Sequence, residues 1–480
     1  MKRKWMVLLM VGSLITGAGG SYAGFYWLDQ QQESKKTQSK EDQTNISEEA
    51  TDLQKVSQAY ELIVSRYVET VDEEELVEGA IQGMLSKLED PYSVYMDKDT
   101  ALQFNQTLES SFEGIGAEVS VVEGKIVIVS PFKGSPAEKA GIKPNDQILK
   151  VDGESVEGLD LYETTLKIRG EKGTKVELEI SRDGLREPLT VQIKRDEIPL
   201  ETVNSDIKEQ NGKKIGYLEI TTFSEDTAKD FKKALKSLEK EGIEGLLLDV
   251  RGNPGGLLSS VEEILRELVT DKKPYVQIEQ RNGKKITYFS ELKKQKAYPV
   301  AVLIDKGSAS ASEILAGALK ETEGYSLIGE KTFGKGTVQQ AVPMGDGSNI
   351  KLTLFKWLTP DGNWIHKKGI EPNVAVQQPD IFRTHPLTIE KPLTLDMNNE
   401  QVKNAQEMLA GLGFAPGRKD GYFNEKTELA VKAFQRVKKL KPTGTIDQQT
   451  ATELVTSIMD ELKREKNDLQ LQTALKFLSK

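Results

Sequence analysis

The sequence contains no cysteine and only two histidines, His366 and His385. The lack of cysteine excludes disulfide bonds, thiolate zinc sites, iron–sulfur clusters, a cysteine nucleophile and a lipid-modified N-terminal cysteine. Two histidines make histidine metal sites and histidine-based catalytic triads hard to build. We therefore expect no metal and no cofactor, and any hydrolytic chemistry has to use Ser, Thr, Lys, Asp or Glu.

Basic residues are fewer than acidic ones: 65 Lys and Arg residues against 75 Asp and Glu residues give a net charge of −10. Such a chain has little electrostatic affinity for phosphates, so no nucleic acid partner is expected. Hydrophobic residues make up 37% and charged residues 29%, which is enough for packed cores. The length predicts roughly three domains at about 150 residues each, and the patterns described below predict a multidomain chain of α/β and α+β class.

The N-terminus has the charge pattern of an exported or membrane-anchored chain. Lys2, Arg3 and Lys4 precede the uncharged stretch 5–28, which is long enough to cross a bilayer as a helix. Residues 1–29 are therefore predicted to be a membrane anchor or signal peptide. Small residues around Ala23 offer a cleavage site, whereas the apolar run that follows them favours the anchor. In both cases the bulk of the chain is extracytoplasmic, anchored in the bacterial cell membrane or secreted.

A linker and a helical region follow. Residues 30–47 contain almost nothing to bury, which predicts a flexible linker. Within residues 48–107 apolar positions recur at helical spacing, which predicts two helices joined near 71–72 and closed by Asp90-Pro91. Their apolar faces would serve a core or a subunit partner.

Residues 108–197 change to the alternating pattern of strands, with one or two short helices. The clearest strands are expected at 118–121, 125–129 and 175–180. Ser135 is placed to cap a short helix that starts with Pro136 and stops at Gly141, and Asp146 begins a turn into a further strand.

This segment resembles the PDZ domain of bacterial proteases. Its helix, Gly-Ile-x-Pro-x-Asp turn, apolar strand and Asp-Gly turn follow one another in the order of that family. PDZ domains add a peptide as an extra strand and hold its carboxylate through backbone N–H groups. The resemblance implies partners with apolar C-terminal tails and places the carboxylate-binding loop at Gly114, Ile115, Gly116 and Ala117. Lys167 and Arg169 are expected either to pair with acidic groups of the following segment, residues 198–385, or to lie in a solvated turn.

Residues 198–385 read as an α/β unit. Strands are predicted at 215–220, 245–250 and 300–304, and helices at 226–238, 259–268 and 311–319. Repeated strand-then-helix units imply a sheet covered on its faces.

Three segments of this unit could carry chemistry. Residues 249–256, Asp-Val-Arg-Gly-Asn-Pro-Gly-Gly, form a strand-to-helix turn whose N–H groups suit an oxyanion, and no Gly-Lys-Ser/Thr follows to make it a phosphate-binding P-loop. Residues 307–313, Gly-Ser-Ala-Ser-Ala-Ser-Glu, place serines near a helix N-terminus, where developing negative charge is stabilised. In the third, residues 329–339, Lys335 lies between two glycines. Because both histidines lie outside these segments, a lysine with a pKa lowered by burial is the available base.

The order of these three motifs resembles the carboxy-terminal processing (tail-specific) serine peptidases, over about residues 53–376. The resemblance implies a crotonase-like core of the ClpP/crotonase type. It also implies an endopeptidase in which Ser310 is the nucleophile, Lys335 the general base and Gln339 the residue that orients the lysine. The oxyanion hole is implied at backbone N–H groups of Gly255 or Gly256 and of Ala311.

Four further residues are predicted to have structural rather than catalytic roles. Ser308 is expected to cap the helix and Ser312 to pack. His366 is expected to be structural or at the surface, and His385 to lie in a linker.

Residues 386–456 resemble the small three-helix peptidoglycan-binding domain. Leucine–glycine, aspartate–glycine and phenylalanine–glutamine pairs occur in the order of that family. The resemblance implies binding to the cell wall, but such bundles also make subunit contacts, so a homodimer is an open alternative. Residues 457–480 are expected to hold a charged amphipathic helix from Leu462 to Leu478.

These resemblances imply an extracytoplasmic serine endopeptidase with a Ser–Lys dyad, whose PDZ domain either gates activity or only tethers the substrate. The alternative is a non-catalytic PDZ and cell-wall-binding scaffold. A cell-wall hydrolase has no support beyond the C-terminal unit, since no metal or paired-carboxylate site is evident.

Overall fold

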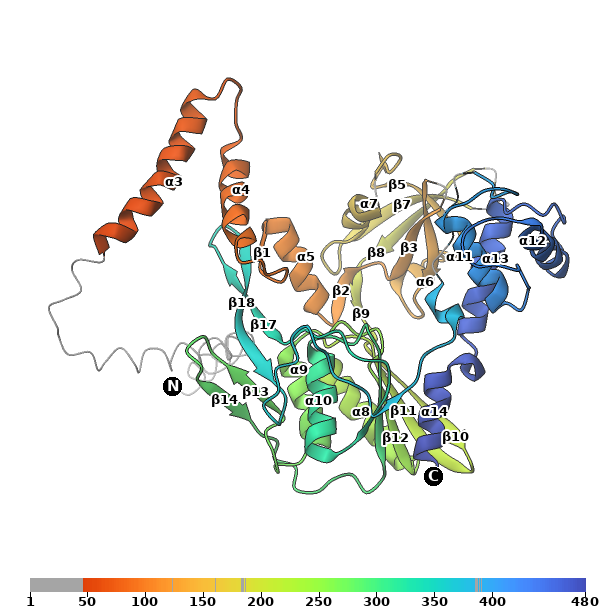
Figure 1. Ribbon diagram of the computed structural model, residues 1–480. Helices are drawn as coiled ribbons and strands as arrows, with labels where there is room; N and C mark the ends of the chain where they lie inside the picture. The colour runs from red at the N-terminus through yellow and green to blue at the C-terminus, as the bar shows by residue number, and fades with distance from the viewer. Residues whose placement is uncertain are drawn as a thin grey trace, which may run out of the picture. The chain divides into compact units, whose positions relative to one another are not determined.

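The computed structural model describes residues 46–480 apart from 123, 160, 183, 184, 186, 385, 386, 388 and 390 (Figure 1). The chain divides into two compact units, Met1–Lys87 and Leu88–Lys480. The predicted anchor or signal peptide at 1–29, the linker up to residue 45, and His385 lie outside the described residues. Within the described ranges, no helix combines the length and the apolar character that a bilayer crossing requires.

The first unit contains the two predicted helices, α3 (Ile46–Arg66) and α4 (Glu73–Ser86). Asp72 caps α4, because its carboxylate accepts hydrogen bonds from the N–H groups of Glu74 and Glu75 at 2.9 and 3.1 Å. The junction near residue 72 is therefore confirmed. Apolar side chains are exposed on both helices, namely Leu53, Val56, Leu62, Ile63, Val77 and Met84.

The second unit continues with α5 (Lys98–Leu108) and then the PDZ-like part. Two antiparallel strands, β2 (Ser111–Gly114) and β9 (Asp196–Pro199), frame that part, so the chain enters and leaves it at one place. Its sheet has the order β3-β4-β5-β7-β8, with β6 beside β5. The elements are β3 (Ala117–Val122), β4 (Lys125–Pro131), α6 (Pro136–Lys139), β5 (Gln147–Val151), β6 (Glu154–Ser155), α7 (Leu161–Ile168), β7 (Lys175–Ser181) and β8 (Leu189–Lys194).

Local sequence signals in this part are confirmed. The Ser135 hydroxyl accepts a hydrogen bond from the Glu138 N–H at 3.2 Å, as expected of a helix cap. In β7 the alternate residues Val176, Leu178 and Ile180 are fully buried, which is why the segment forms a strand with one face in the core.

The α/β unit predicted at 198–385 contains a six-stranded sheet of order β10-β11-β12-β15-β16-β19, parallel except where β10 pairs with β11. Its strands are β10 (Val203–Gln210), β11 (Lys213–Ile220), β12 (Gly245–Asp249), β15 (Val300–Ile304), β16 (Ser326–Gly329) and β19 (Val374–Ala375). Every residue of β12 and β15 is buried, as in a parallel sheet covered on both faces. Helices α8 (Thr227–Lys240), α9 (Leu258–Leu268) and α10 (Ala311–Glu323) lie together on one face (Figure 1).

The other face of this sheet is covered by the last helix of the chain, α14 (Leu469–Leu478). Leu471, Leu475 and Leu478 of α14 pack in one cluster with Leu247 and Leu303, the strand residues that alternate with those facing α8–α10. The prediction of one helix from residue 462 to 478 is wrong. A turn and the short 3-10 helix η2 (Glu465–Asn467) come first, because the Asp468 side chain caps α14 through the Leu471 N–H.

A second sheet of this part of the chain is antiparallel. Its order is β1-β18-β13-β14, with β17 paired to β18. Its strands are β1 (Val94–Met96), β13 (Val276–Glu279), β14 (Lys285–Tyr288), β17 (Thr337–Pro343) and β18 (Asn349–Leu358).

The C-terminal helical unit contains η1 (Asp380–Arg383), α11 (Glu400–Gly411), α12 (Glu425–Val437) and α13 (Gln448–Leu462). Asn399, Asn424 and Asp447 each cap one α-helix by accepting a backbone hydrogen bond. The three helices share a core of their own, so the expected small helical domain is present.

Candidate active site

Ser310 occupies the junction between β15 and α10. It is the N-cap of α10 and has φ +56° and ψ −113°, a conformation that non-glycine residues rarely adopt and that surrounding contacts must hold. The small residues Ala309 and Ala311 on either side are buried. The sequence therefore places a partly exposed hydroxyl on a tight, strained turn at a helix N-terminus.

The two neighbouring serines are structural. The Ser308 hydroxyl donates to the Val250 carbonyl at 2.7 Å, and the Ser312 hydroxyl donates to the Asn253 carbonyl at 2.9 Å. Both are fully buried, so Ser312 packs as predicted. The expectation that Ser308 caps the helix is wrong, because the N-cap of α10 is Ser310, two residues later, and Ser308 ties the loop to the end of β12 instead.

Glu313 joins the nucleophile turn to the lysine loop. Its fully buried carboxylate accepts four hydrogen bonds. One comes from the Ser310 N–H at 2.9 Å and one from the Lys335 N–H at 2.8 Å. The other two come from the Thr332 hydroxyl and the Gly334 N–H, both at 2.7 Å. One carboxylate thus fixes the two backbone segments against each other.

The glycine turn after β12 lies directly against Ser310. A Cβ added to Gly255 would stand 2.9 Å from the Ser310 Cβ and 3.1 Å from the Ala311 nitrogen, so only glycine fits. The Gly255 N–H already donates to Asn253 Oδ1 at 2.8 Å. The N–H groups of Gly256 and Ala311 make no hydrogen bond within the described part of the chain.

Lys335 follows β16 in the loop before β17. Its carbonyl accepts a hydrogen bond from Trp357 Nε1 at 2.8 Å, which fixes the backbone. Its Nζ lies 5.0 Å from the centroid of the Tyr92 ring. Ser310 and Lys335 are thus brought together by Glu313 and not by a direct hydrogen bond between their side chains.

The surroundings of Lys335 favour its neutral form. Burial lowers the pKa of Lys335, and the nearby charge of Lys351 lowers it further. Asp90 and Glu313 act in the opposite direction without reversing the shift. A lysine in this setting is a better general base near neutral pH than an exposed one.

Gln339 lies in β17 just after a register shift between Val338 and Gln339. A shift of this kind re-aims a side chain. The Gln339 amide donates to the hydroxyls of Thr337 and Thr353 at 2.9 and 3.1 Å, not to Lys335.

His366 lies nearer to this site than the sequence indicated. Its ring stacks on Trp364 at a centroid distance of 5.1 Å and meets Tyr92 edge-on at 6.3 Å. Its backbone nitrogen would be 2.7 Å from a Cβ on Gly336, the residue after Lys335. His366 is thus partly buried packing beside the lysine loop, consistent with a structural role.

The predicted peptide-binding loop leads from β2 into β3. Ile115 is buried, and its carbonyl accepts a hydrogen bond from the Ala137 N–H at 2.8 Å, which fixes the loop on α6. Gly116 has φ +71°, and a Cβ there would stand 2.6 Å from that of Ser135. This part of the loop therefore requires glycine.

In the part of the chain that the structure describes, neither Lys167 nor Arg169 pairs with an acidic group of residues 198–385, which was one of the two alternatives. Lys167 pairs with Glu154 inside the PDZ-like part. Arg169 donates to Gln106 of α5 at 3.0 Å and lies over the Phe112 ring at 4.8 Å. Neither chain position nor charge in the sequence indicated these partners.

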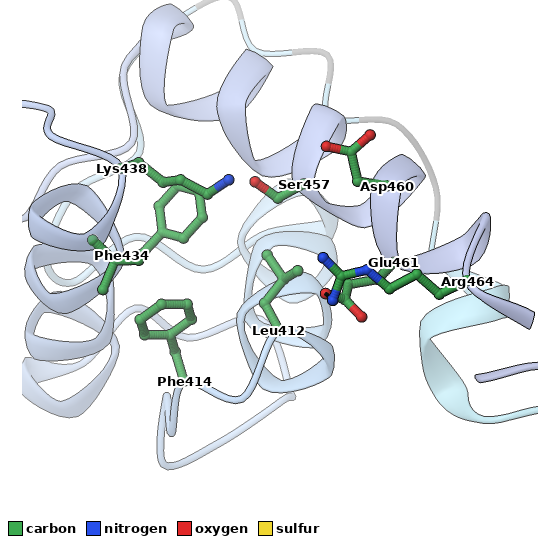
Figure 2. A pocket seen from close by; sticks show the side chains of 9 residues that line it. Leu412, Phe414, Phe434, Lys438, Ser457, Asp460, Glu461 and Arg464 are labelled. Carbon is green, nitrogen blue, oxygen red and sulfur yellow. Dashed lines mark ion pairs between the residues drawn. The ribbon is translucent and has the colours of Figure 1, made fainter. Parts of the chain in front are cut away.

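A separate pocket of about 200 Å³ lies in the C-terminal helical unit (Figure 2). Figure 2 shows Phe414, Phe434 and Lys438 on one side of it and Asp460, Glu461 and Arg464 on the other. The two phenylalanine rings meet edge-on at 5.5 Å. The charged residues are Lys438, Asp460, Glu461 and Arg464.

Sequence reasoning missed three residues of the catalytic neighbourhood. The Ser-x-x-Glu spacing of a capping box could have singled out Glu313, whereas Asn253 and Tyr92 have no such local signal. Among the described residues, no group of three or more acidic, histidine or cysteine side chains is placed to hold a metal.

Four segments of the chain match known protein families. Residues 214–376 match peptidase family S41, 114–194 match the PDZ domain, 398–454 match the putative peptidoglycan binding domain, and 14–100 match the activating protease CtpB N-terminal domain. The chain is 59% identical over 478 residues to the carboxy-terminal processing protease CtpB of Bacillus subtilis (strain 168), covering 100% of this chain and 99% of that protein.

Two further proteins extend the comparison. The carboxy-terminal processing protease CtpA of the same organism is 46% identical over 426 residues, covering 89% of this chain and 90% of that protein. The solved structure of a photosystem II D1 C-terminal processing protease is 32% identical, with a TM-score of 0.42, and covers 66% of this chain and 85% of that one. Because the match to CtpB runs over the whole length, the chain belongs to the carboxy-terminal processing proteases, the serine-type peptidases of family S41.

Proposed function

We propose that Ser310 is the nucleophile of this protease, Lys335 its general base and Gln339 the residue that orients the lysine. The assignment rests on the hydrogen bonds of Glu313. Its carboxylate accepts from the backbone N–H groups of Ser310 and Lys335 at 2.9 and 2.8 Å. The strained serine turn and the lysine loop thus share one buried carboxylate, which supports the assignment.

The oxyanion hole is proposed at the N–H groups of Gly256 and Ala311. Ala311 follows Ser310 in the chain, and Gly256 follows Gly255, which lies against Ser310. Neither N–H group has a hydrogen-bond partner within the described residues. Gly255, the other candidate from the sequence, would serve mainly by its lack of a side chain, because its N–H is bound to Asn253. Loss of one such donor should raise the barrier by roughly 3 kcal/mol.

The reaction follows from these roles. Neutral Lys335 takes the hydroxyl proton as Ser310 Oγ attacks the scissile carbonyl. The resulting oxyanion accepts hydrogen bonds from the N–H groups of Gly256 and Ala311. Collapse breaks the C–N bond, and the leaving amine takes the proton from the Lys335 ammonium. A water then gives its proton to Lys335 and attacks the ester. The second tetrahedral intermediate collapses as the Lys335 ammonium returns that proton to Ser310 Oγ, which releases the carboxylic acid and restores Ser310. For this cycle the Lys335 side chain has to move from the Tyr92 ring to Ser310.

The substrate class follows from the PDZ domain, which we propose binds apolar C-terminal tails at Gly114–Ala117. The family's defined property, capture of peptide C-termini as an added strand, supports this. The match to a peptidoglycan binding domain supports an extracytoplasmic protein, with residues 1–29 as its membrane anchor or cleaved signal.

The finer domain assignment is also a proposal. The parallel sheet covered by helices on both faces supports a crotonase-like core at 198–385. It would stand between the PDZ domain at 108–197 and the peptidoglycan-binding-like domain at 386–456, after the helical region 48–107. The exposed apolar side chains of α3 and α4 support a homodimer.

The catalytic assignment is tested by substituting the three serines of the motif one at a time. Ser310→Ala should abolish cleavage of an unstructured protein that ends in apolar residues, while peptide capture persists, because only a hydroxyl is lost. Ser308→Ala and Ser312→Ala should retain measurable activity. Normal cleavage by Ser310→Ala would overturn the assignment, and no cleavage by the unaltered protein under any condition would favour the non-catalytic scaffold.

A further inference from the structure

The Lys335 ammonium lies on an aromatic ring from a distant part of the sequence. Its Nζ is 5.0 Å from the centroid of Tyr92, within the range of a cation–π contact. Burial, together with Asp90 and Glu313, raises the pKa of Tyr92, so the ring carries a neutral phenol. The contact is therefore between a cation and a ring face, not between two charges.

The turn that carries Tyr92 is firmly held. Asp90 accepts a hydrogen bond from the Tyr92 N–H at 3.1 Å and one from the Ser93 hydroxyl at 2.6 Å. The following strand β1 pairs with β18, with Val94 opposite Lys351. The edge-on contact with His366 supports the ring from another direction. Tyr92 is thus placed beside Lys335 by packing and by backbone pairing.

The same turn also reaches Gln339. The Thr353 N–H donates to the Ser93 hydroxyl at 3.0 Å, and the Thr353 hydroxyl accepts from Gln339 Nε2 at 3.1 Å. One short turn therefore contacts the proposed base directly and its proposed orienting residue through a single threonine.

We propose that Tyr92 is a positioning residue for Lys335. Its ring holds the lysine in the resting enzyme while the lysine is protonated, and the lysine leaves the ring for Ser310 once it has released its proton to solvent. The proposal rests on the proposed role of Lys335 as the base. It goes beyond that role because it assigns a resting position to the base and gives the turn 90–93 a part in the catalytic cycle.

The Tyr92 ring also affects the protonation of Lys335. The titratable groups that face Lys335 are Lys351 of β18, Asp90 of the turn, Glu313 of α10 and, through Tyr92, the ring of His366, whose pKa is lowered by burial. All of these remain when Tyr92 is replaced. Loss of the ring alone removes a contact that favours the ammonium, so the pKa of Lys335 should fall by about half a pH unit.

The test measures the protonation of Lys335 without using catalysis. In the full chain carrying Ser310→Ala, the rate of Lys335 acetylation by limiting acetic anhydride is followed against pH by mass spectrometry, with the exposed Lys306 as internal reference. Tyr92→Leu should shift the Lys335 midpoint down by about half a pH unit. Tyr92→Phe, which keeps the ring, should leave the midpoint in place. Equal midpoints for the Phe and Leu variants would overturn the proposal.

A graded series keeps the test valid if Tyr92→Leu fails to fold. Tyr92 is replaced by phenylalanine and, in further variants, by mono-, di- and trifluorophenylalanine. These side chains keep the ring shape but weaken its negative face stepwise. The Lys335 midpoint should fall stepwise with fluorination, and a constant midpoint would contradict the proposal. Activity of a Lys335→Arg variant would instead refute the role of Lys335 as base and leave these midpoints unaffected, so the two failures are distinguishable.

Discussion

At Ser310 a strained backbone, a helix cap and a buried carboxylate coincide. The φ of +56° persists because Glu313 fixes the Ser310 N–H and, on the far side, the loop of Lys335. A strained residue held by surrounding contacts is a common device for presenting a nucleophile. Here the contact that holds it also sets the distance to the proposed base.

Replacing Glu313 by glutamine should therefore damage catalysis. The glutamine amide has one acceptor oxygen. Its NH2 group would face N–H or O–H groups that donate hydrogen bonds to the carboxylate. We expect a loss of about 2–3 kcal/mol of transition-state stabilisation, or roughly 30- to 150-fold in kcat. Glu323→Gln is the matched control, because Glu323 is a second buried carboxylate on α10 that accepts from Thr270 instead. An equal loss of kcat in both variants would show that the effect is one of general stability.

The lowered pKa of Lys335 predicts the pH dependence of the rate. The base must be neutral, so kcat/KM should rise with pH through the lowered pKa and then level off. Lys335→Arg should be inactive, since arginine stays protonated at any usable pH. A rate that does not change between mildly acidic and alkaline pH would contradict lysine as the base.

Among the elements, α14 has a role that its place at the end of the chain does not suggest. It covers one face of the catalytic sheet, and its cap, Asp468, pairs with Arg251 at 2.9 Å. Arg251 also pairs with Asp249 at 2.6 Å, at the start of the glycine turn. The last helix is thus tied to the loop that carries the proposed oxyanion donors.

Asp468→Asn should destabilise the protein by about 3 kcal/mol, because it leaves the largely buried Arg251 with one charged partner fewer. Asp460→Asn, at an exposed carboxylate of α13, should change stability by less than about 0.5 kcal/mol. Burial opposes ionisation of Asp468, but the hydrogen bond and charge of Arg251, together with the hydrogen bonds from Leu471 and Gln378, outweigh it and lower the pKa. This contribution is therefore present at neutral pH and lost as the pH falls through the lowered value. Urea unfolding of both variants at neutral and acidic pH measures it, and equal effects would refute the pairing.

For the whole molecule the open question is whether the PDZ domain is a switch or a tether. A peptide can shift the balance between two arrangements only by its difference in affinity for them. If the domain is a switch, an apolar C-terminal peptide should speed cleavage of a separate reporter substrate. If it is a tether, the peptide should compete and slow the cleavage.

Deletion of residues 112–197 supplies the comparison. Ser111 and Pro199 are paired in the ladder of β2 and β9, so the cut ends are already close together. Equal reporter cleavage by the intact and shortened proteins, with no response to peptide, would remove the switch and leave a passive tether.

The C-terminal unit is tested by a truncation that ends near Pro392, with α14 rejoined to the core because the catalytic sheet needs it. If the unit binds the cell wall, the truncated protein should no longer sediment with purified peptidoglycan. If it makes subunit contacts, the truncated protein should halve its mass in solution. The pocket lined by Phe414 and Phe434 is the place where substitution should weaken wall binding first.

The sequence alone determined the features that depend on near neighbours. The strand-to-helix order of the catalytic unit, the caps at Asp72 and Ser135 and the helices of the C-terminal unit follow from periodicity and from residues within one turn of each other. The motifs around Ser310 and Lys335 were likewise sufficient to identify the family, because their residue types and order are specific.

Only the tertiary structure decided which groups meet. Tyr92 reaches Lys335 because β1 pairs with β18, and Asp468 reaches Arg251 because α14 folds back on the sheet. The choice between Gly255 and Gly256 depends on the Asn253 side chain, which occupies one of the two N–H groups. Such contacts join segments far apart in the chain, and no local spacing encodes them, since they arise only when long-range pairing and packing close the core.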